Sequence, residues 1–491
     1  MDGLSISARL ASFFGPNRGE GIACASDIRI AASARSVCRR QAVRASLARP
    51  VAAEVGHRLG SACGVGCWAS VEDSIVVLGP PRSGKGLQLV VPLIVGAPGA
   101  VVTTSTRPDN LAITLQSRVK VGPVAVFDPQ GLARGVPGRL RWSPLRGCQD
   151  PGTAMVRARA LTAGAAAGTN ESSFWQASAE QAVRCLLHAG ALAGIGAGEL
   201  YRWSLSPVLA SQAVGVLSDD ARAAAGWGTA LNAILGADVK QRDSIWAMVG
   251  IAFAALADPQ VLDAVSPAAH EEFDPGQFLL SKGSLYLLGT TAGSGTTTRL
   301  VAALVEDIAE TARKLAAGSP NARLDPPLTL VLDEAANYRL PSLPSLMSEG
   351  GGSGISTIVV LQSLAQARAV WGEHEGQALW DAAIVKIVLG GGSSARDLED
   401  LSRLVGTRRD TQRTVSRGAE GKKSWNTSGR DIAILEPASL RQLPFGSALL
   451  LLRSAKPIML TLQAWTKRKD SRELRAGQVE IESMIRAGHG R

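Results

Sequence analysis

The chain has 491 residues, of which 46% are hydrophobic, and this is enough to bury a large core in two or three compact units. Its 52 basic and 42 acidic residues give a net charge of +10, which favours a polyanionic partner such as nucleic acid or an anionic membrane surface. The six cysteines and five histidines have neither the spacing of a disulfide framework nor that of a zinc site, so a cytosolic, reducing compartment fits best.

The N-terminal part of the sequence carries no targeting signal that we recognise. No apolar run in the chain approaches the ~18–20 residues of a membrane span. Residues 1–70 also lack the apolar core of a secretory signal. The sequence therefore predicts a chain without a transmembrane helix, and it assigns no fold to residues 1–70.

An apolar run, Ser74–Leu78, leads directly into a glycine-rich loop and the start of a helix. The loop has the spacing G-x-x-x-x-G-K, which lets consecutive backbone N–H groups point at phosphate oxygens while the lysine reaches the β- and γ-phosphates. Its residues are Gly79, Pro80, Pro81, Arg82, Ser83, Gly84, Lys85 and Gly86. Where the general pattern has a Ser or Thr that ligates Mg²⁺, this chain has Gly86, so that ligand has to come from elsewhere. The loop predicts binding of a nucleoside triphosphate.

Further strand-like runs follow, and helical stretches separate most of them. These runs are Gly99–Thr104, Val124–Phe127, Ser284–Leu288, Leu328–Leu332, Ser356–Leu361, Ala383–Leu389 and Leu449–Leu452. Such alternation is typical of a mostly parallel sheet flanked by helices, so the predicted fold class is α/β.

The pattern changes between the runs Val124–Phe127 and Ser284–Leu288. Long Ala/Leu-rich segments with helical periodicity appear, such as Ser173–Ala193 and Ala221–Leu256, and strand signals vanish. Pro- and Gly-rich stretches bound this region on both sides. We therefore predict an inserted all-α domain. The predicted domains are residues 1–70, a discontinuous nucleotide-binding domain of residues 71–145 and 278–465, the helical domain of residues 146–277, and a basic, solvated tail of residues 466–491.

Two carboxylates, Asp333 and Glu334, come directly after the apolar strand Leu328–Leu332. A P-loop enzyme needs such a pair: Asp333 can hold the Mg²⁺ shell, and Glu334 can orient and deprotonate the attacking water. An acidic pair at a strand end can also simply cap a helix. The glycine-rich loop upstream in the same alternating region favours the catalytic interpretation.

The next strand, Ser356–Leu361, ends at Gln362 and Ser363. If the strand order follows that of motor ATPases, Gln362 lies beside the two preceding strand ends and can sense the γ-phosphate or position water. Ser363 is well suited to be a helix N-cap, and that role is compatible with a sensor at Gln362.

A basic, polar stretch, Arg403–Lys423, follows the predicted strand Ala383–Leu389, and Trp425 comes just after the stretch. Its Gly, Ser and Thr content predicts a mobile loop. Such a loop can bind nucleic-acid phosphates without reading sequence, in a salt-dependent manner. A surface hairpin without a partner is the alternative.

Together these patterns resemble the type IV secretion coupling proteins, the TraG/TraD group of conjugative ATPases, which are related to FtsK-type DNA translocases. The resemblance covers about Asp73 to Ala464. The motifs that carry it are GPPRSGKG at Gly79–Gly86, Val126-Phe127-Asp128-Pro129, Trp142-Ser143-Pro144-Leu145, LVLDEAAN at Leu330–Asn337, Gly354-Ile355 leading into VVLQSLAQ at Val359–Gln366, and Lys386-Ile387-Val388-Leu389-Gly390 before Ala395–Gly406. Relatives in this group often carry Gly after the loop lysine as well.

The resemblance implies a RecA-like P-loop domain with an all-α insertion, six subunits in a ring, and ATP with Mg²⁺ bound between neighbouring subunits. It implies that Lys85 contacts phosphate, that Asp333 holds Mg²⁺, and that Glu334 and Gln362 act in a DNA-stimulated hydrolysis. The implied role is to link a relaxase–DNA complex to a type IV secretion channel at the cytoplasmic face of the membrane.

Two other functions stay open at this point. An FtsK-like DNA translocase would be expected to carry a winged-helix domain after the motor, and only a short segment follows Ala464. A substrate receptor that binds nucleotide with little hydrolysis is the second, because the loop Gly350–Gly354 has no basic residue that could serve as an arginine finger.

Overall fold

The computed structural model describes residues 21–40, 43–164, 172–290, 297–417 and 423–490. The chain divides into two compact units. The first contains the described residues within 1–41, 49–96 and 360–468, and the second those within 42–48, 97–359 and 469–491. The boundaries of these units differ from the predicted domain boundaries. The predicted domains therefore stay a prediction.

The second unit contains a fully parallel set of strands in the order β8-β7-β4-β6-β5. Every residue of β4, β6, β7 and β8 is buried. Parallel strands that are covered on both faces need such continuous apolar runs, which is why the sequence showed them clearly. The strands are β4 Ala100–Ser105, β5 Val124–Phe127, β6 Ser284–Leu288, β7 Leu328–Leu332 and β8 Ile355–Leu361, and β8 continues into the first unit at its last two residues.

In the first unit, β3 (Ile75–Leu78) is parallel to β9 (Val385–Leu389), and antiparallel strands continue from β9. The order is β2-β1-β13-β12-β9-β3. The added strands are β12 Ser447–Leu452, β13 Ile458–Thr461, β1 Gly56–Ala62 and β2 Val65–Ser70. The predicted strands were thus confirmed, whereas β1, β2 and β13 had not been predicted.

Part of the N-terminal segment therefore has a defined structure. Helices α2 (Ala25–Ala31), α3 (Ala34–Cys38) and α4 (Ala52–Val55) precede the β1–β2 hairpin. Its two-residue turn, Cys63-Gly64, has φ of 48° and 77°, the left-handed pair that a tight hairpin turn requires.

Between β5 and β6 every described element is a helix. Four of these helices begin with an Asp or Ser N-cap followed by Pro, at Asp150, Ser206, Asp258 and Asp274. The predicted helical stretch Ala221–Leu256 is broken, because Gly236 ends one helix and Asp238 caps the next. The helices are α7 Pro151–Thr162, α8 Ser172–Leu192, α9 Ala197–Leu205, α10 Pro207–Asp219, α11 Trp227–Leu235, α12 Val239–Phe253, α13 Pro259–Ala264 and α14 Pro275–Leu280.

The remaining helices connect or flank the strands. In the second unit they are α6 Asp109–Val119, α15 Thr297–Ala317, α16 Leu343–Glu349 and α21 Ser471–His489. In the first unit they are the π-helix η1 Gly86–Val90, α5 Val91–Val95, α17 Leu364–Trp371, α18 Glu373–Ala382, α19 Ala395–Val405 and α20 Pro437–Arg441. None of the helices in the described ranges combines the length and apolar character needed to cross a membrane.

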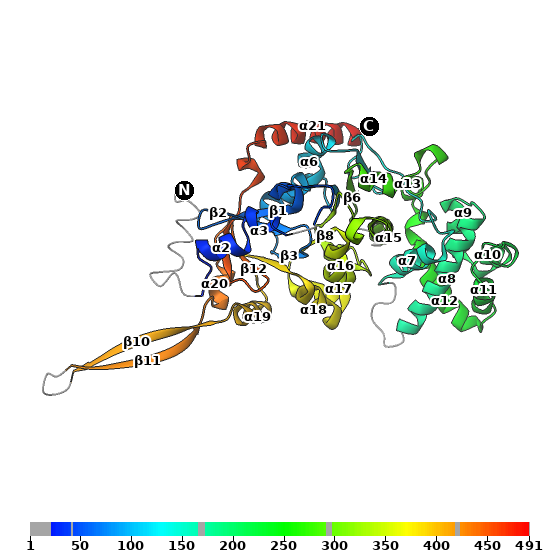
Figure 1. The fold of residues 1–491 in the computed structure, drawn as a ribbon. Helices are drawn as coiled ribbons and strands as arrows, with labels where there is room; N and C mark the ends of the chain where they lie inside the picture. The colour runs from blue at the N-terminus through cyan, green and yellow to red at the C-terminus, as the bar shows by residue number, and fades with distance from the viewer. Residues whose placement is uncertain (1–20, 41–42, 165–171, 291–296, 418–422, 491) are drawn as a thin grey trace. The chain divides into compact units, whose positions relative to one another are not determined.

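Two expectations for the C-terminal third were wrong. The predicted solvated tail is helix α21, which packs along α6 and buries Leu474, Gly477 and Ile481 (Figure 1). The predicted mobile loop is largely a two-stranded ribbon of β10 (Thr407–Arg417) and β11 (Lys423–Ala433), drawn in orange in Figure 1. Charged and small polar residues are interspersed in both segments and obscured the periodicity that marks a helix or a strand.

Candidate functional site: a phosphate loop and a carboxylate pair

The glycine-rich loop connects β3 to η1, as predicted. Arg82 and Gly84 take left-handed backbone conformations, with φ of 63° and 91°. The N–H of Gly79 donates to the carbonyl oxygen of Leu361 at 3.0 Å, which ties the start of the loop to the end of β8. The loop therefore has a defined path before any ligand binds.

Close approaches explain the first two glycines of the loop, Gly79 and Gly84. A Cβ atom at Gly79 would lie 2.7 Å from both Leu389 Cδ1 and Ser83 Oγ. At Gly84 a Cβ would lie 2.8 Å from Phe445 Cε2, and the positive φ adds strain for any other residue. The pattern G-x-x-x-x-G thus reflects the shape of this loop.

Lys85 reaches back across the loop. Its Nζ donates to the carbonyl oxygen of Gly79 at 2.5 Å and to that of Pro80 at 3.4 Å. A phosphate oxygen is a stronger acceptor for an ammonium group than these neutral carbonyls. An anion bound in the loop can therefore replace these carbonyl oxygens as the acceptor for the Lys85 ammonium group.

Two buried polar atoms next to the loop have no hydrogen-bond partner among the described residues. They are Ser83 Oγ and Gln88 Oε1. Gln88 is 5% exposed, and a Cβ at Gly84 would lie 3.1 Å from its Oε1. A buried polar atom without a partner costs ~1–3 kcal/mol, so such atoms point to a missing ligand. The π-helical turn that carries Gln88 is itself a feature frequent at functional sites.

The predicted carboxylates follow β7 in the second unit. Asp333 accepts hydrogen bonds from Asn110 Nδ2 at 3.2 Å and from the N–H of Glu334 at 3.1 Å. The backbone of Glu334 is left-handed, with φ 50° and ψ 43°, and this costs a residue with a side chain of order 1–2 kcal/mol. Such strain is typical of functional positions.

Neighbouring side chains fix the direction of the Glu334 carboxylate. Its Oε2 accepts from Thr106 Oγ1 at 2.6 Å and from Asn337 Nδ2 at 3.1 Å. Thr104 Oγ1 donates to the backbone oxygen of Asp333 at 2.9 Å. Sequence reasoning missed the two threonines, although a polar run at the end of an apolar strand is a usable signal.

The region after β8 shows the helix cap that was considered for Ser363. Its Oγ accepts from the N–H of Gln366 at 3.1 Å, and Gln366 Oε1 accepts from the N–H of Gln362 at 3.2 Å. This reciprocal arrangement is close to a capping box, except that the glutamine reaches the residue before the cap. The sensor role of Gln362 stays a prediction.

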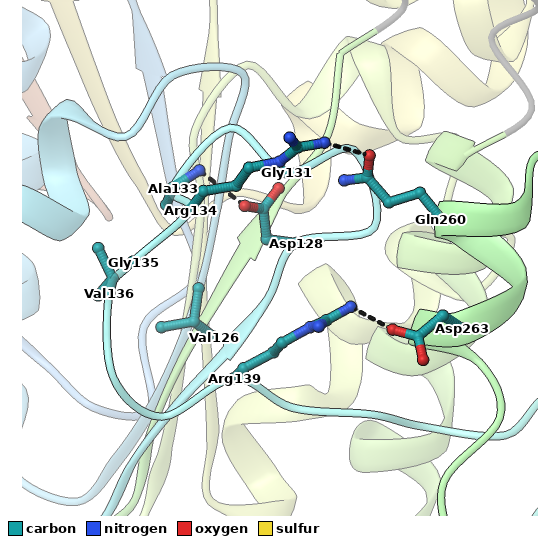
Figure 2. Close-up of a pocket in the computed structure, with 10 residues that line it drawn as sticks. All are labelled: Val126, Asp128, Gly131, Ala133, Arg134, Gly135, Val136, Arg139, Gln260 and Asp263. Atoms are coloured by element: carbon teal, nitrogen blue, oxygen red, sulfur yellow. Dashed lines mark hydrogen bonds and ion pairs between the residues drawn. The ribbon is translucent and has the colours of Figure 1, made fainter. Parts of the chain in front are cut away.

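A cavity of about 390 Å³ in the second unit follows β5 (Figure 2). The carboxylate of Asp128 accepts the backbone N–H groups of Leu132 at 2.8 Å and Ala133 at 2.7 Å. Arg134 contacts Gln260, and Arg139 pairs with Asp263 on α13 (Figure 2). The motif Val126–Pro129 therefore shapes the turn after β5, and each of these charged side chains has a partner: backbone N–H groups for Asp128, Gln260 for Arg134 and Asp263 for Arg139.

The family model "Type IV secretory system Conjugative DNA transfer" matches residues 32–201, and "TraM recognition site of TraD and TraG" matches residues 327–445. No curated protein matches the chain.

Solved structures share the fold at low identity. The bacterial conjugative coupling protein TrwBdeltaN70, unbound, superposes with a TM-score of 0.63 at 17% identity, over 89% of this chain and 93% of that one. TrwB in complex with ADPNP gives a TM-score of 0.61 at 18% identity, over 83% of this chain and 89% of that one. This likeness confirms the predicted α/β class, a RecA-like P-loop fold with a mostly parallel sheet flanked by helices.

The two family models match different parts of the chain and together cover more than half of it. The first includes the glycine-rich loop and the motifs at Asp128 and Trp142, and the second includes the motifs at Asp333 and Gln362. Over both matched segments the chain therefore resembles the TraG/TraD-type conjugative coupling proteins.

Proposed function

We propose that this chain is a P-loop ATPase that couples a relaxase–DNA complex to a type IV secretion channel and drives conjugative DNA transfer. The observation that carries the proposal is the preformed loop Gly79–Gly86. Lys85 Nζ reaches back to the carbonyl oxygen of Gly79, and two buried polar atoms, Ser83 Oγ in the loop and Gln88 Oε1 after it, have no partner among the described residues. The resemblance to conjugative coupling proteins supplies the biological setting.

ATP and Mg²⁺ are the proposed cofactors. Structures of TrwB hold ADPNP, and ADP with Mg²⁺. In this chain the orphaned Ser83 hydroxyl can donate to a phosphate oxygen, and Lys85 can exchange carbonyl acceptors for phosphate. Asp333 is the proposed Mg²⁺ holder, since Gly86 has no hydroxyl. Bound Mg²⁺ would neutralise charge that develops on the phosphates.

Glu334 is the proposed catalytic carboxylate. Thr106 and Asn337 hold one of its oxygens. The other oxygen can then accept a proton from an attacking water, which is the task of a general base in hydrolysis. Gln362 is proposed to sense the γ-phosphate or to position water.

DNA, a relaxase or related DNA-processing complex, and secretion-channel components at the cytoplasmic membrane face are the proposed partners. The net charge of +10 supports a polyanionic partner. A homo-hexameric ring is the proposed assembly. The mass of the purified particle with ATP tests it, and a strictly monomeric particle at every protein concentration contradicts it.

The decisive experiment measures ATP hydrolysis by the full chain with and without single- and double-stranded DNA. Lys85→Ala removes the phosphate contact and Glu334→Gln removes the base, and we expect each to reduce turnover ~10²-fold or more. Lys120→Ala, which alters an exposed lysine, is the matched control and should hydrolyse ATP as the wild type does.

The outcomes separate the candidate functions. Stimulation by DNA that both substitutions abolish supports the motor. Tight ATP binding without turnover under any DNA condition supports instead a nucleotide-binding receptor. The receptor is the alternative because the glycine-rich segment Gly350–Gly354 contains no basic residue that could act as an arginine finger on a neighbouring subunit.

A further inference from the structure

A second cavity, of about 370 Å³, lies against the glycine-rich loop within the first unit. Loop residues Pro80–Ser83 form one wall. The turn after β9, at Gly390 and Gly391, forms another wall, and the segment from Arg441, where α20 ends, to Phe445 forms the third. The cavity therefore borders the loop that is proposed to take the phosphates.

Phe445 presents its ring at this cavity. It is 58% exposed, in contrast to the buried Leu449, Leu450 and Leu452 of the adjoining β12. The turn that carries it is nonetheless anchored on both sides: the N–H of Ser447 donates to Pro444 O at 3.0 Å, and the N–H of Leu462 donates to Gly446 O at 2.8 Å. The ring is thus held in solvent by a fixed turn.

The ring also contacts the end of the loop where the helix begins. A Cβ placed on Gly84 would lie 2.8 Å from Phe445 Cε2 and 3.0 Å from Cζ. A ligand with its phosphates on the N–H groups of the loop would have its next chemical group beside this ring. For a nucleotide, the groups beyond the phosphates are the sugar and the base.

We infer that Phe445 is the stacking platform for the nucleobase of the bound nucleotide. This inference rests on the proposed nucleotide-binding function and assigns a residue outside the phosphate loop to it. An aromatic face attracts any base by stacking and carries no hydrogen-bond code. Phe445 therefore adds affinity for nucleotides as a class, and ATP and GTP should benefit similarly.

The test compares ligands with and without a base. Dissociation constants of Mg²⁺-ATP, Mg²⁺-GTP and Mg²⁺-tripolyphosphate are measured by calorimetry on the full chain. We expect Phe445→Ala to weaken the binding of ATP and of GTP ~5- to 150-fold, the range of base–aromatic stacking, and to leave tripolyphosphate binding unchanged. Phe445→Trp should retain ATP affinity. Phe174→Ala, at an exposed aromatic of the second unit, is the matched control.

Three results would overturn the assignment. Equal weakening of ATP and tripolyphosphate would mean that the ring only supports the loop. Unchanged ATP affinity would mean that no base contacts it, and tighter binding of both ligands would mean that the ring obstructs the loop. Failure of the proposed function looks different, because wild-type protein would then bind neither ATP nor tripolyphosphate, and Lys85→Ala would change nothing.

Discussion

The hydroxyl of Thr106 lies 2.6 Å from Oε2 of Glu334, although 228 residues separate the two in the sequence. The carboxylate sits on a left-handed backbone and has few ways to keep its direction without this contact. Thr106 therefore acts as a positioning residue for the proposed base.

Thr106→Val should lower kcat of ATP hydrolysis ~10- to 100-fold and leave the dissociation constant of ATP unchanged. The change keeps the shape but removes one hydrogen bond to a charged group, worth ~1.5–3 kcal/mol. Steady-state kinetics and equilibrium binding measure the two quantities. Thr103→Val is the matched control, since Thr103 Oγ1 has no hydrogen-bond partner among the described residues. A loss of ATP affinity equal to the loss in kcat would contradict the positioning role.

Residues of the candidate site differ in how far the sequence revealed them. Lys85 and the Asp333–Glu334 pair were predictable because each belongs to a short sequence pattern, the glycine-rich loop and the carboxylates after an apolar strand, that is typical of nucleotide binding. Thr106 and Phe445 could not be predicted in the same way, because each acquires its role from a neighbour that only the folded chain brings close.

Strand β1 buries a titratable side chain in the first unit. His57 is 2% exposed, and burial lowers its pKa from 6.5 to about 4. Between these pH values the His57 imidazole is therefore protonated in the unfolded chain and neutral in the folded chain. By linkage the free energy of unfolding falls as the pH drops from 6.5 towards 4.

His57→Leu should flatten this part of the pH profile, by up to ~3 kcal/mol between pH 6.5 and 4. Urea unfolding of both proteins across this range measures the difference in slope. His270→Leu, at an exposed histidine, should keep the wild-type slope. Parallel profiles for wild type and His57→Leu would show that His57 is not the group responsible.

A buried ionic cluster joins α7 and α15 with the Trp142–Leu145 motif. Asp307 is 5% exposed and accepts from Trp142 Nε1 at 3.0 Å. It pairs with Arg157 at 2.8 Å and with Arg146 at 3.2 Å, and Arg157 also lies over the Trp142 ring. One carboxylate thus compensates two guanidinium groups, one of them fully buried.

Asp307→Asn should lower the free energy of unfolding by about 3–5 kcal/mol, because it leaves buried positive charge uncompensated. Chemical denaturation followed by circular dichroism measures the change. Asp243→Asn, which alters an exposed ion pair, should change stability by less than ~0.5 kcal/mol. A similarly small effect at Asp307 would mean that the cluster contributes little to stability.

Elements were predictable where burial gave them a simple pattern. The fully buried strands β6 and β7 were predicted to the residue. The β1–β2 hairpin was missed because glycines and polar residues interrupt its alternation, and α21 was missed because only a narrow stripe of it is buried against α6.

The charge of the whole molecule is unevenly distributed along the chain. Residues 407–433 contain seven basic and three acidic residues, so this one hairpin supplies a net +4 of the total +10. Its described basic residues Arg409 and Arg430 are exposed. A two-stranded ribbon with such charge suits contact with nucleic-acid phosphates, which needs no sequence readout.

Replacement of residues 407–433 by Asn-Gly should weaken DNA binding and reduce its salt dependence, while ATP binding is kept. The excision is compatible with the fold because the N–H of Ile434 donates to Gly406 O at 3.0 Å, so the two ends already meet. Each phosphate interaction that the excision removes lowers the slope of log affinity against log salt by ~0.7–0.9, and we expect a decrease of ~2–4 in total. Fluorescence anisotropy with single- and double-stranded DNA over a salt series measures it. An unchanged slope would place the DNA contacts on other basic residues of the chain.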